Sequence, residues 1–377
     1  MKVLYLTESL LPHIDGVSLT MARLFGMLAA HGVDFRILSP FVPGADVEWA
    51  SRVYPMPYVR FPLYPDYRVT LPTARIAAHF DDWGPDLMHV VSPTPFAMRA
   101  MRGARRRGVP VVSSFHTHFV SYFRYYRLGA LEAAGWRLLR SFYAGCEAVF
   151  APSPAILREL AKQGILHAEL WSRGVDTDRF SPLRRDESLR ARIPGEGPVI
   201  LFVGRLVKEK DVGDVVAVSH RLLAQGIAHR MVLVGDGPMR RALQRRLPSA
   251  CFVGHQQGDA LARWYAAADM FFFPSTTETF GNVVLEALAS GLPAVVSDWG
   301  GPQDLVLDGE TGFICPGKDI EAFAGALGWL VANAAPRRAM AARARTLAVG
   351  RSWATVNCRL LDAYHRIADP PALTARA

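Results

Sequence analysis

The sequence predicts an α/β fold of two domains, each built on a parallel β-sheet. The chain has 377 residues, of which 50% are hydrophobic, and this is enough for two cores. Short apolar runs alternate with helical patterns, which is typical of parallel sheets whose strands are joined by helices. Residues 179–198 interrupt this alternation with charged residues, Pro and Gly, after which it restarts.

The first half opens with an apolar run at residues 3–7 that ends at Glu8. This run is too short for the hydrophobic region of a signal peptide, so we interpret it as the first strand. A helix is expected at 16–31, and further strands at 33–39, 86–91, 109–113 and 148–151. In the second half, strands are expected at 199–203, 231–234, 250–253, 269–273, 294–297 and 313–315. This alternation predicts two Rossmann-like domains that face each other across a cleft.

Composition restricts the class of protein and its partners. The net charge of +9 and the pI near 9.6 favour an anionic partner, which is a nucleotide diphosphate, an acidic membrane surface or a nucleic acid. The four cysteines lie far apart, which argues against a zinc site and a disulfide framework and favours a reducing cytoplasm. No window approaches about 18 apolar residues, so no membrane span is expected.

Two carboxylates flank a tight turn and a helix start in the second half. Glu278 precedes the turn, Gly281 and Asn282 supply turn and capping chemistry, and Glu286 lies about one turn inside the helix. The free N–H groups of such a helix suit an anion. Because the segment follows an expected buried strand at 269–273, it lies at the edge of the sheet where ligands bind. The pattern favours an extended ligand such as a nucleotide-sugar.

A nicotinamide dehydrogenase is the main rival for such a sheet. Its fingerprint is Gly-x-Gly-x-x-Gly opening a helix after the first strand. The stretch at 235–240 lacks the third glycine, and the loop at 8–16 contains only Gly16. The sequence therefore argues against a dinucleotide-dependent oxidoreductase.

Residues 274–293 (PSTTETFGNVVLEALASGLP) resemble the signature of retaining glycosyltransferase family 4, whose two glutamates, eight positions apart, line the donor site of a GT-B fold. The resemblance extends to 202–210 (FVGRLVKEK), 234–238 (VGDGP), 252–254 (FVG) and 300–304 (GGPQD). Within the family, the sequence resembles lipid-directed members such as sulfoquinovosyl-diacylglycerol synthases and GDP-mannose-dependent α-mannosyltransferases.

The resemblance and the pattern together divide the chain. We expect an acceptor-binding domain at 1–180, a linker at 181–198 and a nucleotide-sugar-binding domain at 199–351. By resemblance, a helix at 352–368 crosses back to pack on the first domain. A frayed tail is expected at 369–377.

The resemblance assigns the donor site residue by residue. Arg205 and Lys210 are expected to hold the diphosphate, Arg205 through its planar guanidinium group and Lys210 as a point charge. Glu278 is expected to bind sugar hydroxyls and to stabilise charge in catalysis, and Glu286 to accept from the ribose. The Glu-Lys-Gly that is usual in the family is replaced here by Glu209, Lys210 and Asp211. This departure is expected to alter the geometry of the loop and to add a negative charge near the phosphates.

The remaining donor-site candidates come from both domains. Gly16 opens the first helix, where a missing side chain lets backbone N–H groups approach a phosphate. His116 follows a strand and resembles the residue that touches the donor sugar near its reacting carbon, whereas His118 is interpreted as packing. The other candidates are Gly254 near the base and the loop residues Thr279, Phe280, Gly281 and Asn282.

The resemblance implies retention of configuration and an α-linked product. We expect transfer of a mannose- or glucose-type hexose from a GDP- or UDP-sugar, with no cofactor and no metal, because Arg205 and Lys210 would hold the diphosphate without one. A covalent intermediate would need a nucleophilic carboxylate beneath the anomeric carbon. We favour attack from the same face, with the departing phosphate as the base.

The acceptor is expected to be a membrane glycolipid or a lipid-linked sugar. Residues 119–143 interleave arginines with aromatic and aliphatic side chains, and 99–107 adds five arginines, which favours an anionic membrane surface. This indicates peripheral association with the cytoplasmic face of the inner membrane. Alternatives are synthesis of an exopolysaccharide or lipopolysaccharide, a nucleotide-sugar epimerase and a basic nucleic-acid-binding protein; the last leaves the glutamate pair unexplained, so we expect no nucleic-acid partner.

Overall fold

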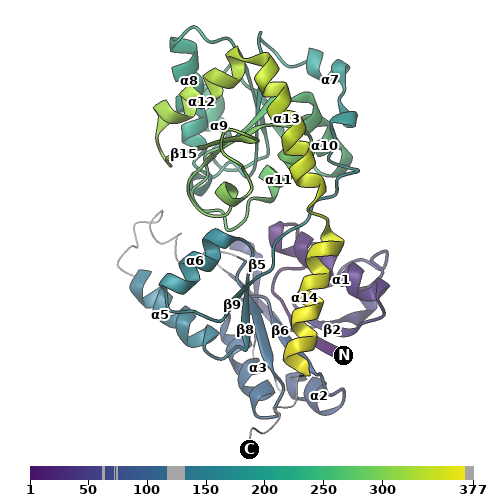
Figure 1. Ribbon diagram of the computed structural model, residues 1–377. Coiled ribbons are helices and arrows are strands. Elements are labelled where there is room, and N and C mark those ends of the chain that lie inside the picture. The colour runs from purple at the N-terminus through teal and green to yellow at the C-terminus, as the bar shows by residue number, and fades with distance from the viewer. Residues whose placement is uncertain (62–63, 72, 74, 117–131, 370–377) are drawn as a thin grey trace, which may run out of the picture.

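The computed structural model describes residues 1–61, 64–71, 73, 75–116 and 132–369. Two α/β domains lie one above the other in Figure 1, and the chain crosses between them more than once. Each domain is built on a parallel sheet with helices on both faces. The predicted two-domain α/β architecture is confirmed.

The first domain contains a seven-stranded parallel sheet in the order β3-β2-β1-β6-β7-β8-β9. Its strands are β1 (Lys2–Leu6), β2 (Asp34–Ser39), β3 (Val53–Pro55), β6 (Leu87–Val90), β7 (Val111–Ser114), β8 (Ala148–Ala151) and β9 (Ala168–Leu170). A separate antiparallel hairpin pairs β4 (Tyr58–Phe61) with β5 (Tyr64–Thr70). The helices are α1 (Gly16–Ala30), α2 (Arg75–Asp81), α3 (Pro95–Arg105), α5 (Glu132–Tyr143) and α6 (Pro154–Lys162).

Alternating side chains of β1 divide this core into two layers. Val3 and Tyr5 pack with α1 on one face of the sheet, and Leu4 and Leu6 pack with α3 and α5 on the other. Strand β7 begins two residues later than its apolar run, because Pro110 has no N–H to donate to a ladder. Burial on both faces explains why the central strands, such as β1 and β6, are mostly apolar.

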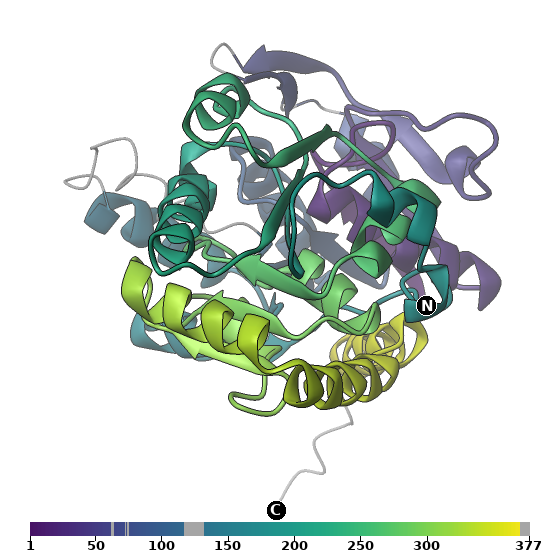
Figure 2. The same ribbon diagram turned by 90° about the horizontal axis from the view of Figure 1, so that it is seen from above.

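The second domain contains a six-stranded parallel sheet in the order β12-β11-β10-β13-β14-β15. Its strands are β10 (Val199–Val203), β11 (Arg230–Val234), β12 (Cys251–Gly254), β13 (Met270–Phe273), β14 (Ala294–Ser297) and β15 (Gly312–Cys315). The helices are α7 (Glu187–Ala191), α8 (Val212–Ala224), α9 (Arg240–Arg246), α10 (Gly258–Ala267), α11 (Asn282–Ala289), α12 (Ile320–Ala332) and α13 (Ala334–Val349). Figure 2 shows this domain from above, with α12 and α13 along one side.

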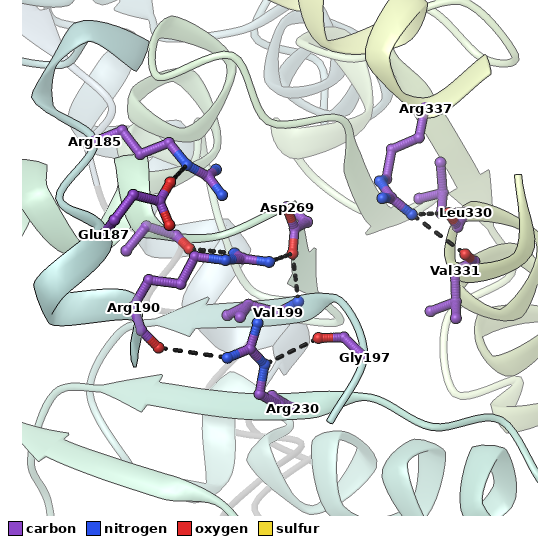
Figure 3. Close-up of polar contacts among 11 residues, drawn as sticks. Arg185, Glu187, Arg190, Gly197, Val199, Arg230, Asp269, Leu330, Val331 and Arg337 are labelled. Carbon is purple, nitrogen blue, oxygen red and sulfur yellow. Dashed lines mark hydrogen bonds and ion pairs between the residues drawn. The ribbon is translucent and has the colours of Figure 1, made fainter. Parts of the chain in front are cut away.

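The stretch expected to be a linker is folded against the second domain. It contains a 3₁₀ turn, η3 (Pro182–Arg184), and helix α7. Arg190 of α7 donates to the carbonyl of Ala267 at 2.7 Å and to Asp269 at 2.7 Å, and Asp269 also accepts from the N–H of Val199 (Figure 3). These bonds connect α7 to the starts of β10 and β13. Helix α7 has only five residues, which is too short for a periodic pattern to predict.

Helix α14 (Trp353–Ala368) returns to the first domain, along which it lies in Figure 1. Its Tyr364 is fully buried, accepts from the hydroxyl of Tyr5 at 3.1 Å and hydrogen-bonds to His89. Asn357 of the same helix accepts from the indole N–H of Trp171 at 3.3 Å. In the part of the chain that the structure describes, no helix is both long and apolar enough to cross a membrane.

Candidate active site between the domains

The strand orders locate the candidate site. The strand order of the second sheet reverses between β10 and β13, because β11 and β12 lie on one side of this pair and β14 and β15 on the other. The loops that follow β10 and β13 therefore diverge and leave a crevice at the carboxyl ends of these strands. The loop after β10 carries Arg205 and Lys210, and the loop after β13 carries Glu278. The topology therefore brings together residues that lie about 70 positions apart in the sequence.

Three successive residues of the first loop contact three of the second. The carbonyl of Glu209 accepts from the hydroxyl of Thr277 at 2.8 Å. Lys210 forms an ion pair with Glu278. These bonds and those of the following residue form a zipper between the two loops, defined here as residues 209–211 and 276–278.

Asp211 forms the third contact of the zipper. Its carboxylate accepts from the N–H and the hydroxyl of Thr276, both at 2.8 Å, and it also pairs with Lys318. The Asp211 backbone is left-handed, with φ at 54°, a conformation that Asp adopts more readily than most residues. Asp211 therefore tolerates the backbone that the family's glycine would have there. Its negative charge is compensated by Lys318.

Arg205 occupies the same loop without touching Glu278. Its side chain is 60% exposed, and its Nη2 lies 3.8 Å from Oε1 of Glu209. An exposed guanidinium keeps its conformational freedom until a ligand orders it. The structure therefore places Lys210 in the pair with Glu278 and Arg205 at the solvent side of the loop.

Gly281 begins helix α11 and is its N-cap, with φ at 90°. Asn282 is the first helical residue, and its side chain makes no capping bond, so the expected capping role of Asn282 is not observed. The loop before the helix is held by Gly301, whose N–H donates to the carbonyl of Glu278 at 2.9 Å. A Cβ on Gly301 would lie 2.3 Å from the carbonyl oxygen of Thr279, so only glycine allows this approach.

Glu286 lies one turn into α11 and is partly buried. Its Oε2 accepts from the hydroxyl of Tyr265 at 2.9 Å. Burial raises the pKa of Glu286 to about 7, although the hydrogen bond from Tyr265 opposes the shift. Near neutral pH this carboxyl therefore exists in both protonation states.

Gly16 and His116 of the first domain meet the loop at the start of α11. A Cβ built on Gly16 would lie 3.5 Å from Nδ2 of Asn282, which is an ordinary contact distance. The hydroxyl of Thr279 donates to the carbonyl of His116 at 2.7 Å. These contacts cross the domain boundary, so Gly16, His116, Thr279 and Asn282 lie at one interdomain site.

Arg173 determines the tautomer of His116. Arg173 donates from Nη2 to Nδ1 of His116 at 2.8 Å, and the carbonyls of Trp171 and Ser172 accept from its Nη1. Burial and the nearby guanidinium hold the pKa of His116 well below its ordinary value, so its ring is neutral. A neutral imidazole that accepts at Nδ1 carries its proton at Nε2. That Nε2 is buried and has no hydrogen-bond partner among the described residues.

Sequence reasoning missed Arg173 and Glu8. Arg173 follows β9, and its position after a strand is the only feature of the sequence that could have identified it as a site residue. Glu8 follows β1, where the order of the first sheet reverses between β1 and β6, and it accepts from the hydroxyl of Thr94 at 2.8 Å. Burial raises the pKa of Glu8 to about 7. The same rule about reversing strand order that located the second-domain loops would have identified it.

The structure also locates Gly254 and Phe280. Gly254 ends β12 at the far edge of the sheet, with φ at 85° and its Cβ position 3.2 Å from Arg240. The side chain of Phe280 is buried in the second core, so only its backbone is available to a donor. His118 and most of the basic aromatic segment lie outside the described residues. Within the residues described, no cluster of three or more His, Cys, Asp or Glu side chains could hold a metal.

Two Rossmann-like domains with the candidate site between them form a GT-B fold, which the chain shares with solved glycosyltransferase structures. The model for Glycosyltransferase Family 4 matches residues 14–179, and the model for glycosyl transferases group 1 matches residues 197–333. The chain therefore belongs to glycosyltransferase family 4, and the predicted family is confirmed.

Three comparisons illustrate the relationship. The chain is 36% identical to a GDP-mannose-dependent alpha-mannosyltransferase of Mycobacterium tuberculosis, over 97% of each chain. It is 34% identical to the sulfoquinovosyl transferase SQD2 of Arabidopsis thaliana, over 72% of this chain and 54% of the relative. Its fold is similar to that of sucrose-phosphate synthase from Thermosynechococcus elongatus, with a TM-score of 0.75 and 20% identity over 97% and 98% of the two chains.

Proposed function

We propose that this glycosyltransferase moves a mannosyl group from GDP-mannose to a membrane glycolipid or lipid-linked sugar, with retention, to give an α linkage. The observation that carries the proposal is the interdomain site, in which Lys210 pairs with Glu278 and the loop that carries Glu278 meets Gly16 and His116 of the other domain. The 36% identity to a GDP-mannose-dependent relative supports mannose as the sugar and GDP as its carrier.

The proposed step exchanges one bond at the sugar. The acceptor oxygen bonds to the anomeric carbon while the bond from that carbon to the phosphate oxygen breaks. The acceptor proton passes to the departing phosphate oxygen on the same face, and the nucleoside diphosphate leaves. Lys210 and Arg205 stabilise the negative charge of the leaving group without a metal, and Glu278 binds sugar hydroxyls. Neutral His116 donates from Nε2 to the sugar, and Glu286 accepts from the ribose.

Ligand-dependent thermal stability tests the donor. A ligand at 100 times its dissociation constant stabilises the folded state by about 2.7 kcal/mol, so GDP-mannose should raise Tm by several degrees. UDP-glucose should have a smaller effect, and Lys210→Met should abolish the shift. Equal stabilisation by UDP-sugars would contradict the GDP assignment. Unchanged transfer in EDTA would support the role of the two cations.

The anomeric outcome tests the mechanism. NMR of the product should show the same configuration as the donor, and a trapped covalent glycosyl-Glu278 would overturn same-face attack. Turnover of the donor with no acceptor present, to give an isomeric nucleotide-sugar, would indicate an epimerase instead.

Helix α5 supports an acceptor at a membrane surface. Arg137, Leu138 and Arg140 are exposed on it, and Leu138 is 57% exposed. Exposed arginines beside an apolar side chain suit the headgroup region of an anionic bilayer, where each cation contributes about 1 kcal/mol. The protein should cosediment with vesicles that contain phosphatidylglycerol, and Arg137→Glu with Arg140→Glu should weaken this binding. Equal binding to neutral vesicles would contradict membrane recruitment by charge.

A further inference from the structure

A cavity of about 280 Å³ lies where the two domains meet residues 350–359, which run from the end of α13 into the first turns of α14. Its walls come from the start of α6, the segment after β9, the 3₁₀ turn η5 (Pro302–Asp304) and the first turns of α14. Figure 1 shows α6 in the lower domain and α14 running down from the junction. Phe280, in the loop before α11, also lines this cavity, but the donor-loop cations Arg205 and Lys210 do not.

Positive charge dominates the cavity wall. Three arginines, Arg173, Arg351 and Arg359, line it together with one carboxylate, Asp304, so three positive charges face one negative charge. Asp304 already accepts from the N–H of Ala155 at 2.7 Å and lies 3.3 Å from Arg158. The carboxylate is therefore engaged by groups other than the three arginines.

Arg173 is buried without an acidic partner among the described residues. It is 4% exposed, and the acceptors of its hydrogen bonds are two carbonyls and the neutral His116. Burial lowers its pKa to about 9, which reflects the cost of an uncompensated charge. A buried arginine on a cavity wall is the arrangement that an anionic ligand would complete.

The other two arginines line the cavity from the segment 350–359. Arg351 is partly buried, and its side chain makes no hydrogen bond or ion pair with any residue that the structure describes, although Asp304 is close enough to act on its charge. Arg359 is exposed and likewise has no such partner in the described chain. Both guanidinium groups are therefore available to a ligand.

We propose that this cavity binds a phosphate group, either inorganic phosphate or a small phosphate monoester, and that the bound anion joins the two domains. Planar guanidinium groups match phosphate oxygens in pairs. The volume lies just below the range of about 300–1,000 Å³ that holds drug-sized ligands, so a nucleotide is too large. Arg173 contacts both the cavity and His116, so occupancy of the cavity acts on the active site.

Calorimetric titration with inorganic phosphate tests the site. The titration is done with the wild type and with Arg205→Met, which lacks one cation of the donor loop. Arg205→Met is then the background for the further substitutions. Adding Arg351→Met and Arg359→Met should raise the Kd for phosphate at least tenfold. Adding Arg366→Met, on the same helix but paired with Glu169 outside the cavity, should change it less than twofold. Circular dichroism and Tm verify folding.

Three outcomes would overturn the proposal. The first is the absence of saturable phosphate binding in the Arg205→Met background. The second is an equal effect of the cavity variants and Arg366→Met, which would indicate general electrostatic attraction. The third is evidence that the cavity holds a lipid headgroup. In that case the cavity variants would not bind phosphatidylglycerol vesicles, and glycerol 3-phosphate would not compete with the vesicles for the wild type. We expect the cavity variants to bind vesicles as the wild type does.

Discussion

At the residue scale, Gly16 is a position where the fold does not require glycine. Its φ is not left-handed, and a Cβ would meet Asn282 at an ordinary distance of 3.5 Å. Gly16→Ala should therefore change Tm by less than about 2 °C, since a surface substitution without strain costs under about 0.5 kcal/mol. If the missing side chain admits a phosphate, the KM for the donor should rise at least tenfold. An unchanged KM would remove Gly16 from the donor site.

Arg173 is predicted to act on His116 as a positioning residue. Selective ¹⁵N labelling should show the wild-type His116 as the Nε2–H tautomer over the range of folding pH. In Arg173→Met the ring should become a mixture of tautomers, and kcat should fall more than the KM for the donor rises. Arg173→Lys, which keeps one donor, should partly restore the tautomer. A pure Nε2–H form in Arg173→Met would contradict the prediction.

Glu286 predicts two opposite pH trends. Its pKa is raised from 4.5 to about 7, so the folded state holds the proton more tightly than the unfolded chain does. Between about pH 4.5 and 7, this carboxyl therefore destabilises the fold as pH rises. If the Glu286 carboxylate accepts from the donor ribose as proposed, kcat/KM for the donor should fall as pH drops through 7. Glu286→Gln should remove this contribution from both the kcat/KM and the Tm profiles, while Glu8, with a similar pKa, remains as an internal reference.

At the element scale, the zipper between residues 209–211 and 276–278 holds the two loops in register. Asp211→Asn keeps the left-handed preference and an acceptor for Thr276, and it should cost little stability. Asp211→Gly keeps the backbone and removes the carboxylate that accepts from Thr276, which should cost about 1–3 kcal/mol of stability. The pairing of Lys210 with Glu278 should loosen, and kcat should fall with it. Equal kcat in both variants would show that the backbone alone positions the pair.

Sequence patterns predicted most elements, and the misses have physical causes. Strands such as β10 and β14 were predicted at their observed bounds, because burial on both faces makes them continuous apolar runs. Helix α7 was missed because five residues carry no period, and its stability comes from Arg190 and Asp269. The capping role of Asn282 was misplaced by one residue, because the left-handed Gly281 ends the loop without a side-chain cap.

At the scale of the whole molecule, Asp304 is a charged connection between the domains. It joins η5 of the second domain to the start of α6 in the first. Asp304→Asn should weaken this connection, so small-angle scattering should show a larger radius of gyration in the absence of ligand. Asp81→Asn is the matched control, because its ion pair with Arg107 lies within one domain. Identical scattering from both variants would show that other contacts set the orientation.

The sequence by itself determined the two α/β domains, the family and the residue types of the donor site. These follow from local apolar periodicity and from a long motif, both of which can be read within a few dozen residues. Only the tertiary structure decided that Arg173 orients His116, that Asp211 is neutralised by Lys318, and that three arginines share a cavity. These pairings join residues far apart in the chain, and side-chain contact across loops has no local signature in the sequence.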